Sequence, residues 1–300
     1  MIGISACLVG EACRYDGNHN TIERASRLAK FGTVIKLCPE VLGGLPTPRP
    51  PAEIRILEGK RKVFDRDGKD VTLAFEEGAK ETLKICQEKG IKYVVLKDRS
   101  PSCGKKYIYD GTFSGVLTEG NGITVDLLEQ NGIQVFSSEG APYEKLMVYD
   151  YLETQGISYK VYRHEPVFTV DEAKQIEIHI EGEHCKNLFL RDQKKKYYLV
   201  ILPQWQEIKL KDLANQIGAG KLSFASPQEL HAHLGVKPGS VGVFGLLYDQ
   251  QRLVQPFVSK EMNKEIDITF HPNENDETLG ISYPNFIKFV NRLGYNMKEF

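Results

Sequence analysis

Short apolar runs alternate with helical patterns along residues 1–137. The apolar runs are rich in Ile and Val and bounded by Gly or Pro, which predicts buried strands at residues 2–6, 33–37, 93–96 and 133–136. Helices are predicted between these strands at residues 21–30, 71–89 and 123–130, and a hairpin at residues 54–57 and 62–65. Repeated strand–helix units favour a doubly wound, mostly parallel, Rossmann-like α/β sheet.

The pattern changes near residues 137–143, where Ser-Ser-Glu-Gly-Ala-Pro interrupts the alternation. Beyond this point strands are predicted at residues 159–162, 187–191, 197–202, 241–247 and 265–270. Helices are expected at residues 143–155, after the capping box Ser226-Pro-Gln-Glu229, and from Tyr283-Pro284. Strands that do not alternate regularly with helices predict an α+β domain with a mixed, barrel-like sheet. We therefore expect two domains, residues 1–140 and 143–300.

Composition and charge limit the binding partners and the cellular compartment that we expect for this protein. A chain of 300 residues with 41% hydrophobic and 26% charged residues is long enough for two globular domains. Its net charge of −1 excludes a protein whose whole surface binds nucleic acid, and we expect no DNA partner. No apolar stretch approaches the roughly 20 residues of a membrane span. Because six cysteines occur without a secretory signal, we expect a reducing, cytoplasmic location.

Three cysteines follow predicted strands in the first half of the chain: Cys7, Cys38 and Cys103. The carboxyl ends of parallel strands meet at one edge of a sheet, so these thiols are expected to converge. Their wide spacing excludes a zinc ribbon and suits a metal or iron–sulfur site with one open position. Cys86 is expected in the core of a helix, whereas Cys13 is equally suited to a fourth ligand and to loop packing.

Several motifs around these cysteines resemble the thiouracil desulfurase family over roughly residues 1–140. They are Ser5-Ala-Cys-Leu-Val-Gly10, Arg14-Tyr-Asp-Gly17, Cys38-Pro-Glu-Val-Leu-Gly-Gly-Leu-Pro-Thr-Pro-Arg-Pro-Pro-Ala-Glu53, Ser100-Pro-Ser-Cys-Gly104 and Tyr109-Asp-Gly-Thr-Phe-Ser-Gly115. The resemblance implies a 4Fe–4S cluster on three cysteines and removal of sulfur from a small thiolated pyrimidine such as 2-thiouracil. By position, the ligands are Cys7, Cys38 and Cys103.

Polar residues in the same motifs are candidates for the chemistry. Glu40 follows a predicted ligand by two residues and is a candidate general acid or base, with helix capping as the alternative. Ser100 or Ser102 is expected to bind the base or carry a proton. Arg14 and Arg49 are candidates for a nucleotide phosphate, although most arginines are solvated surface residues. The alternative to an enzyme is a module that binds thiolated nucleosides or tRNA without turnover.

The second half contains no recognisable metal or nucleophile pattern. His231 and His233 lie two apart on a predicted helix and face different directions. An apolar strand opened by Lys186 and Asn187 is more informative. A lysine in this position is usually a surface residue with a buried stem, but opposite Phe270-His-Pro-Asn273 it can equally meet a phosphate or ester.

This half resembles the free-standing prolyl-tRNA editing proteins of the aminoacyl-tRNA deacylase superfamily. The motifs are His164-Glu-Pro-Val-Phe-Thr169 with Glu172-Ala173, the run Lys186-Asn-Leu-Phe-Leu-Arg-Asp192, Lys221-Leu-Ser-Phe-Ala-Ser226, Leu234-Gly-Val-Lys-Pro-Gly-Ser-Val241, and Phe270-His-Pro-Asn-Glu-Asn275 with Thr278. The resemblance implies cofactor-free hydrolysis of misacylated tRNA(Pro), above all alanyl-tRNA(Pro), with cysteinyl-tRNA(Pro) as the alternative. Lys186 aligns with the family's essential lysine, and His271 lies in its substrate-pocket motif.

The residues fit a site that orients a reactive ester and a water at the tRNA acceptor end. Lys186, with Asn187 beside it, would hold the terminal adenosine. Backbone amides of Gly239, Ser240 and Gly242 would bind the ester or the substrate amine. Lys194-Lys-Lys196 is either a basic tip for the tRNA backbone or a solvated hairpin turn.

Overall fold

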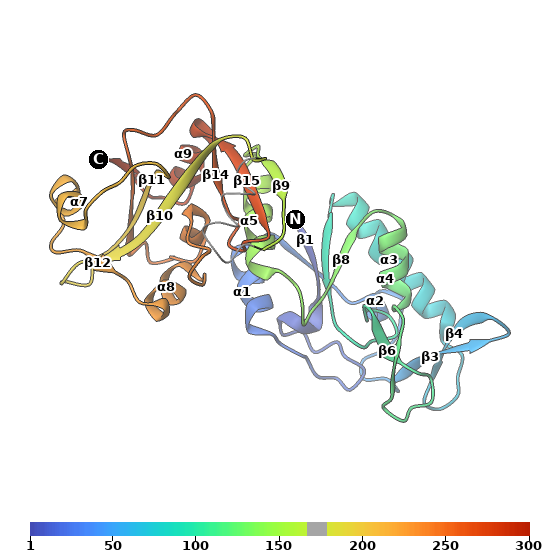
Figure 1. The fold of residues 1–300 in the computed structure, drawn as a ribbon. Helices are drawn as coiled ribbons and strands as arrows, with labels where there is room; N and C mark the ends of the chain where they lie inside the picture. The colour runs from blue at the N-terminus through green and yellow to red at the C-terminus, as the bar shows by residue number, and fades with distance from the viewer. Residues whose placement is uncertain (167–178) are drawn as a thin grey trace. The chain divides into compact units, whose positions relative to one another are not determined.

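The structure is a computed structural model that describes residues 1–166 and 179–300 (Figure 1). The chain divides into two compact units, Met1–Asp150 and Tyr151–Phe300. Each unit is described by itself. Within the described residues, no helix combines the length and apolar character needed to cross a membrane.

A four-stranded sheet in which all neighbours run parallel forms the centre of the first unit. Its order is β2 (Val34–Leu37), β1 (Ile2–Ser5), β5 (Tyr93–Leu96) and β8 (Gln134–Ser137). The four strands predicted from the apolar runs are therefore confirmed, with ends shifted by a residue or two. Successive connections leave in opposite directions between β1 and β5, the kind of position at which open α/β sheets bind ligands.

Helices pack on both faces of this sheet. On one face, α3 (Thr72–Glu88) and α4 (Ile123–Gln130) share a buried cluster with Val94 and Leu96 of β5. Side chains alternate along a strand, so Tyr93 points to the opposite face. There it stacks on Tyr149 of α5 (Tyr143–Thr154), with ring centroids 5.9 Å apart. An ion pair from Arg24 joins α1 (Glu23–Phe31) to α5. The predicted parallel α/β arrangement is thus confirmed.

Short elements extend the strand ends that carry the cysteines. The 3-10 helix η1 (Ala6–Val9) follows β1 directly, and the single-turn helix α2 (Pro39–Leu42) follows β2. Two hairpins lie nearby, β3 (Ala52–Leu57) with β4 (Lys60–Asp65), and β6 (Tyr107–Tyr109) with β7 (Leu117–Glu119). The backbones of α2 and α3 touch at two glycines: a Cβ on Gly78 would stand 1.9 Å from the carbonyl oxygen of Pro39, and one on Gly43 1.9 Å from that of Ala74. Only glycine permits this approach.

The second unit contains a mixed eight-stranded sheet with helices beside it. The main path runs β16 (Lys298–Glu299), β13 (Val254–Val258), β11 (Tyr197–Pro203), β10 (Glu183–Arg191), β14 (Asp267–Phe270), β15 (Glu277–Ser282) and β9 (Lys160–Arg163), and β12 (Ser223–Phe224) pairs with β10. The helices with described bounds are α7 (Leu210–Ile217), α8 (Pro227–Leu234) and α9 (Tyr283–Arg292). The expected mixed sheet is confirmed, as is the capping box that begins α8.

Strand β10 changes partners along its length. Its first residues pair in parallel with β14, in the register Glu183 to Ile268 and His184 to Thr269, and its last residues pair with β12. Its other edge pairs with β11 from Cys185 to Arg191. Among the described residues, residues 185–188 therefore have a strand neighbour on one side only. Lys186 and Asn187 lie in this interval, where β10 separates from β14.

The strand predicted at residues 241–247 is wrong. The structure has a 3-10 helix, η2 (Val243–Leu247), with bonds from Tyr248 N to Gly245 O of 2.9 Å. All of η2 is buried, and the Phe244 ring packs edge-on against Phe270 and Phe289. A run that is apolar at every position has no period, so its spacing could not distinguish a strand from a buried helical turn.

Candidate functional sites

Four cysteines line one cavity of about 550 Å³ in the first unit. Cys7 lies in η1, Cys38 between β2 and α2, Cys103 in the loop after β5, and Cys13 in the loop after η1. The three predicted ligands therefore do meet at the carboxyl edge of the parallel sheet. Cys86 lies fully buried in the core beside α4, as expected.

Burial and contact with neighbouring groups raise the pKa values of the Cys13, Cys38 and Cys103 thiols. Contact with the Cys13 thiol and burial raise the pKa of Cys38 far above its ordinary range. Hydrogen bonding to Cys38 lowers the pKa of Cys13, but hydrogen bonding with Cys7 together with burial outweighs it and raises that pKa to about 11. Burial, followed by the charges of Glu40 and Cys38, raises the pKa of Cys103 to about 12. A cationic metal group would reverse this preference, because it stabilises thiolates.

The donor set fits an iron–sulfur cluster better than a single ion. Within residues 1–166 and 179–300, no group of three or more His, Cys, Asp or Glu side chains lies close enough to hold one metal ion. A 4Fe–4S cluster places each thiolate on a different iron, so its ligands stand further apart than those of a single ion. Thiols from three strand ends around one cavity, with soft sulfur as the common donor, suit such a cluster.

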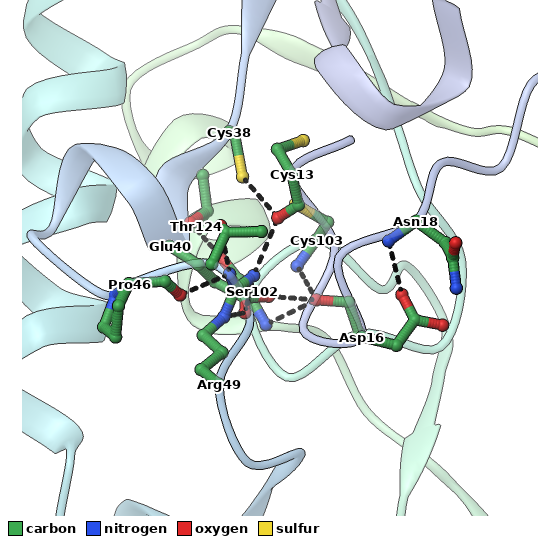
Figure 2. A network of polar contacts seen from close by, with 12 residues as sticks. Cys13, Asp16, Asn18, Cys38, Glu40, Pro46, Arg49, Ser102, Cys103 and Thr124 are labelled. Carbon is green, nitrogen blue, oxygen red and sulfur yellow. Dashed lines mark hydrogen bonds and ion pairs between the residues drawn. The ribbon is translucent and has the colours of Figure 1, made fainter. Parts of the chain in front are cut away.

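Glu40 is held in place by two partners from distant parts of the chain. Its Oε2 accepts hydrogen bonds from Arg49 Nε at 2.9 Å and Nη2 at 2.6 Å, and its Oε1 accepts one from Ser100 Oγ at 3.2 Å (Figure 2). The carboxylate lies in the first turn of α2 and lines the cavity. It is therefore fixed beside the thiols rather than capping a helix.

Arg49 is committed to the cavity wall. Besides Glu40, it donates to the carbonyl oxygens of Cys13 at 3.1 Å and Pro46 at 3.1 Å and to Thr47 Oγ1 at 3.2 Å (Figure 2). These are five hydrogen bonds, as many as a guanidinium has N–H groups. The side chain is 6% exposed. Arg49 therefore braces Glu40 and the Cys13 loop, and its contact with a phosphate stays a prediction.

The other predicted polar residues divide between the cavity and the core. Ser100 lines the cavity, and its Oγ also accepts from the backbone N–H groups of Ser102 and Cys103. Ser102 is fully buried and its hydroxyl bonds Thr124 Oγ1 at 2.8 Å (Figure 2). This placement corrects the expectation that Ser102 contacts a base. Arg14 lines the cavity and binds Asp16 and Asn20.

Two buried carboxylates on the cavity were missed by the sequence reasoning. Asp98 directly follows β5 and accepts hydrogen bonds from Ser137, Ser138 and the Glu139 N–H at the end of β8. Glu53 accepts from the Phe113 N–H at 2.9 Å. Each is 7% exposed. Their position at the end or start of a strand was the available signal, because such ends meet at the site.

In the second unit, Lys186 and Asn187 lie side by side in β10. The Lys186 ammonium donates to the backbone carbonyl of Gln206 at 3.3 Å, just beyond the end of β11. The side-chain oxygens of Asn187 and Gln206 are buried and have no hydrogen-bond partner among the described residues. Buried amide oxygens normally have one, so this region holds acceptors that residues 1–166 and 179–300 do not satisfy.

His271 follows β14, the strand beside β10. Its Nδ1 lies 2.9 Å from the Glu277 carbonyl oxygen and 3.3 Å from Thr278 Oγ1, which is also 2.9 Å from His164 Nε2. A Cβ on Gly242 would stand 3.7 Å from the His271 carbonyl oxygen, so these two predicted residues lie together. Thr278 and His164 had been noted only as parts of motifs.

The remaining predicted contacts of this half lie on turns. Gly239 is exposed, and the Ser240 N–H donates to the Lys237 carbonyl at 3.1 Å, which corrects the expectation that this amide binds a substrate. Residues 194–196 form the exposed turn between β10 and β11, ordered by Asp192, which accepts from the Lys194 and Lys196 N–H groups. Residues 167–169, 172 and 173 of the editing-like motif lie outside the described residues.

Comparison with known proteins accounts for both halves. The family model for 2-thiouracil desulfurase matches residues 2–140, and that for the aminoacyl-tRNA editing domain matches residues 164–289. The uncharacterized protein YbbK of Bacillus subtilis (strain 168) is 44% identical over 143 residues, which cover 46% of this chain and 95% of YbbK. The prolyl-tRNA editing protein ProX of Acetoanaerobium sticklandii is 37% identical over 148 residues, 49% of this chain and 90% of ProX. The chain belongs to both families.

Among solved structures, a [4Fe-4S]-dependent thiouracil desulfidase, TudS, is 47% identical in sequence and covers 47% of this chain and 92% of its own, with a TM-score of 0.44. The two family matches show that the protein joins a thiouracil desulfurase family domain to an aminoacyl-tRNA editing domain, as the motifs predicted. The cavity of cysteines lies within the first family match, and Lys186 and His271 lie within the second.

Proposed function

We propose that the first unit removes sulfur from a small thiolated pyrimidine such as 2-thiouracil with the help of a 4Fe–4S cluster. The observation that carries this proposal is the convergence of Cys7, Cys38 and Cys103 on one cavity within the desulfurase family match. These three cysteines would hold the cluster. When bound, it would supply an iron with affinity for the thiocarbonyl sulfur, so that the adjoining carbon becomes open to attack by water.

The chain's own part is to hold and move a proton. Glu40 lies on the cavity with Oε2 fixed by Arg49 and Oε1 by Ser100. Because Ser100 lines the same cavity, a proton passed between its hydroxyl and Glu40 would stay beside the substrate. Arg14 and Tyr15 lie on the same wall and would face the base. Asp98 and Glu53 would keep the wall polar.

Anaerobic purification followed by iron and sulfide analysis, with uracil formation from 2-thiouracil measured in the same sample, tests this proposal. We expect iron and sulfide in a cluster ratio and turnover that requires both. Protein that remains free of iron after reconstitution would reject it. Protein that binds 2-thiouracil without forming uracil would support the alternative, a binding module.

We propose that the second unit hydrolyses misacylated tRNA(Pro), with alanyl-tRNA(Pro) as substrate. The family match supports this, together with the pairing of the start of β10 with β14, the strand that precedes His271, and the approach of Gly242 to the His271 carbonyl oxygen. The Lys186 ammonium would hold the terminal adenosine, and Asn187 would accept from a substrate donor. An aminoacyl ester is already reactive, so orientation of the ester and a water supplies most of the rate. A small pocket would admit alanine and exclude proline.

Deacylation of alanyl-tRNA(Pro) by the full chain and by Lys186→Ala tests this assignment. We expect the variant to lose activity while its thermal unfolding stays close to that of the unchanged protein. Wild-type turnover in the variant would contradict the role of Lys186. Preferential hydrolysis of cysteinyl-tRNA(Pro) would replace alanine as the substrate and leave the reaction class unchanged.

All six cysteines are free, which supports a cytoplasmic location for both activities.

A further inference from the structure

The chain has a single tryptophan, Trp205, and its side chain is 64% exposed. Tryptophan is among the residues with the largest apolar area and is highly buried on average. An indole left this open costs stability that packing would otherwise supply. A ligand that covers the Trp205 indole would recover this free energy.

Trp205 lies in the turn that follows β11, beside the lysine site. The Gln204 N–H donates to the His184 carbonyl of β10 at 2.8 Å, and the Gln206 N–H donates to the Pro203 carbonyl at 3.0 Å. The backbone carbonyl of Gln206 itself accepts a hydrogen bond from the Lys186 ammonium at 3.3 Å. Trp205 therefore immediately precedes Gln206, the residue whose carbonyl binds the Lys186 ammonium.

Unsatisfied acceptors mark the same region. Asn187 Oδ1 and Gln206 Oε1 are buried and have no hydrogen-bond partner within the described parts of the chain. Burying such oxygens without partners costs free energy that a ligand with N–H or O–H donors would recover. The Lys186 ammonium, the Gln206 amide oxygen and the open aromatic face of Trp205 together match a nucleotide, which offers phosphate oxygens as acceptors, hydroxyl or amino groups as donors, and a base that stacks.

We propose that Trp205 is a stacking platform for a nucleobase at the 3′ end of the tRNA acceptor strand. This inference rests on the proposed deacylase function and adds a binding site outside the family motifs. The base lies on the indole, while Lys186 holds the adjoining phosphate or ribose, and Gln206, the residue after Trp205, accepts from its donors. Trp205 touches the bound nucleic acid but not the ester, so it contributes to binding rather than to the hydrolytic step.

Because the chain has one tryptophan, fluorescence excited at wavelengths that tyrosine does not absorb reports on Trp205 alone. The full-length protein is titrated with the trinucleotide CCA and, separately, with adenosine 5′-monophosphate. We expect saturable quenching by CCA that weakens in Lys186→Ala. In deacylation assays Trp205→Ala should raise the KM for alanyl-tRNA(Pro) by about 5- to 100-fold with kcat preserved, the range expected for one lost base stack. Trp205→Phe should restore most of the binding.

Leu253→Ala is the matched control, because Leu253 is a 51% exposed apolar residue elsewhere in the same unit. It should leave both KM and the quenching unchanged. A wild-type KM in Trp205→Ala, or no quenching at saturating CCA, would overturn the proposal. If Trp205→Ala instead abolished self-association in sedimentation while KM stayed the same, the indole would belong to a protein interface and the proposal would fail. Failure of the deacylase proposal is distinguishable, since an inactive wild-type protein can still be titrated with CCA.

Discussion

In the first unit the polar side chains around the cavity bind one another, whereas in the second unit buried amide oxygens beside Lys186 lack a partner among the described residues. Arg49 makes five hydrogen bonds within its own wall, and Glu40 and Ser100 are engaged with each other. Asn187 and Gln206, in contrast, each carry an unsatisfied oxygen. Polar groups are therefore used for scaffolding at one site and left available at the other.

This difference indicates how each site would take its ligand. A wall whose hydrogen bonds are already made is rigid and leaves sulfur as the free donor, which suits a soft inorganic group. A site with unmade hydrogen bonds stores free energy that binding of a polar ligand releases. The two halves of the chain therefore point to different ligand chemistry, and they should fail independently.

The largest expected effect is a complete separation of the two activities. Stripping iron from the full chain with a chelator under air should abolish conversion of 2-thiouracil, because the thiols of Cys7, Cys38 and Cys103 would lose their cluster. Hydrolysis of alanyl-tRNA(Pro) by the same sample should be unchanged, as measured by loss of the labelled aminoacyl group. Loss of both activities together would contradict the expectation that the two sites fail independently. Lys186→Ala is the converse variant, with iron content unchanged and deacylation lost.

A smaller effect is expected from Arg49→Lys. Lysine keeps the charge but lacks the planar fork that reaches Glu40, Cys13 and Pro46 together. We expect a loss in kcat for 2-thiouracil of about 10- to 100-fold, as for other groups that orient a ligand shell. Iron content and KM should stay near those of the unchanged protein.

Arg27→Lys is the control for this substitution, since Arg27 forms a surface ion pair with Glu23 on α1. Exposed pairs of this kind contribute little, so activity should not change. An equal loss of kcat in both variants would show that the arginine substitution acts through general destabilisation and not through Glu40.

Buried polar groups in the two units should give stability effects of opposite sign. Ser102→Ala leaves Thr124 Oγ1 without its 2.8 Å partner and should lower the free energy of unfolding by about 1–3 kcal/mol. Asn187→Leu removes an oxygen that has no partner among the described residues and should raise stability by about 1 kcal/mol while weakening tRNA binding. Calorimetric melting of the full chain measures both. Destabilisation by Asn187→Leu would mean that this amide is satisfied in solution.

The smallest expected effect is the pH dependence of stability at the turn formed by residues 194–196. Backbone hydrogen bonds, first from the Lys196 N–H, hold the pKa of Asp192 below its ordinary value. A depressed pKa means that the ionised form stabilises the folded state above the ordinary pKa, and that this contribution is lost as pH falls through the folded-state value. Asp192→Asn should therefore melt at a lower temperature than the unchanged protein at neutral pH. The difference should vanish in strong acid, and a constant difference would contradict this reasoning.

The sequence predicted the central strands of the first unit and the convergence of the thiols, because both depend on local patterns and on one rule of parallel sheets. The runs before Cys7, Cys38 and Cys103 had strand composition, and their pairing brings the three together. The partners of Glu40 could not be predicted in the same way. Ser100 lies 60 residues from Glu40 in the chain, and no periodicity encodes such a contact.

Ser102 illustrates the same limit at short range. It differs from Ser100 by two positions in one loop, yet it points into the core toward Thr124 while Ser100 reaches the cavity. The direction of a side chain in an irregular loop depends on the tertiary contacts around it. The helix η2 escaped prediction for a related reason, since its burial on every side removed the pattern that would distinguish it from a strand.

The strand order of the first unit makes formation of its cavity depend on pairing of β1, β2 and β5. Cys7, Cys38 and Cys103 leave β1, β2 and β5, and β1 lies between the other two strands. A nascent chain that ends before residue 93 contains two of the three thiols and lacks the strand that brings the third beside them. Any group that requires all three sulfurs can be captured only after β5 has paired with β1, so cofactor loading would report that synthesis of this unit has passed Cys103.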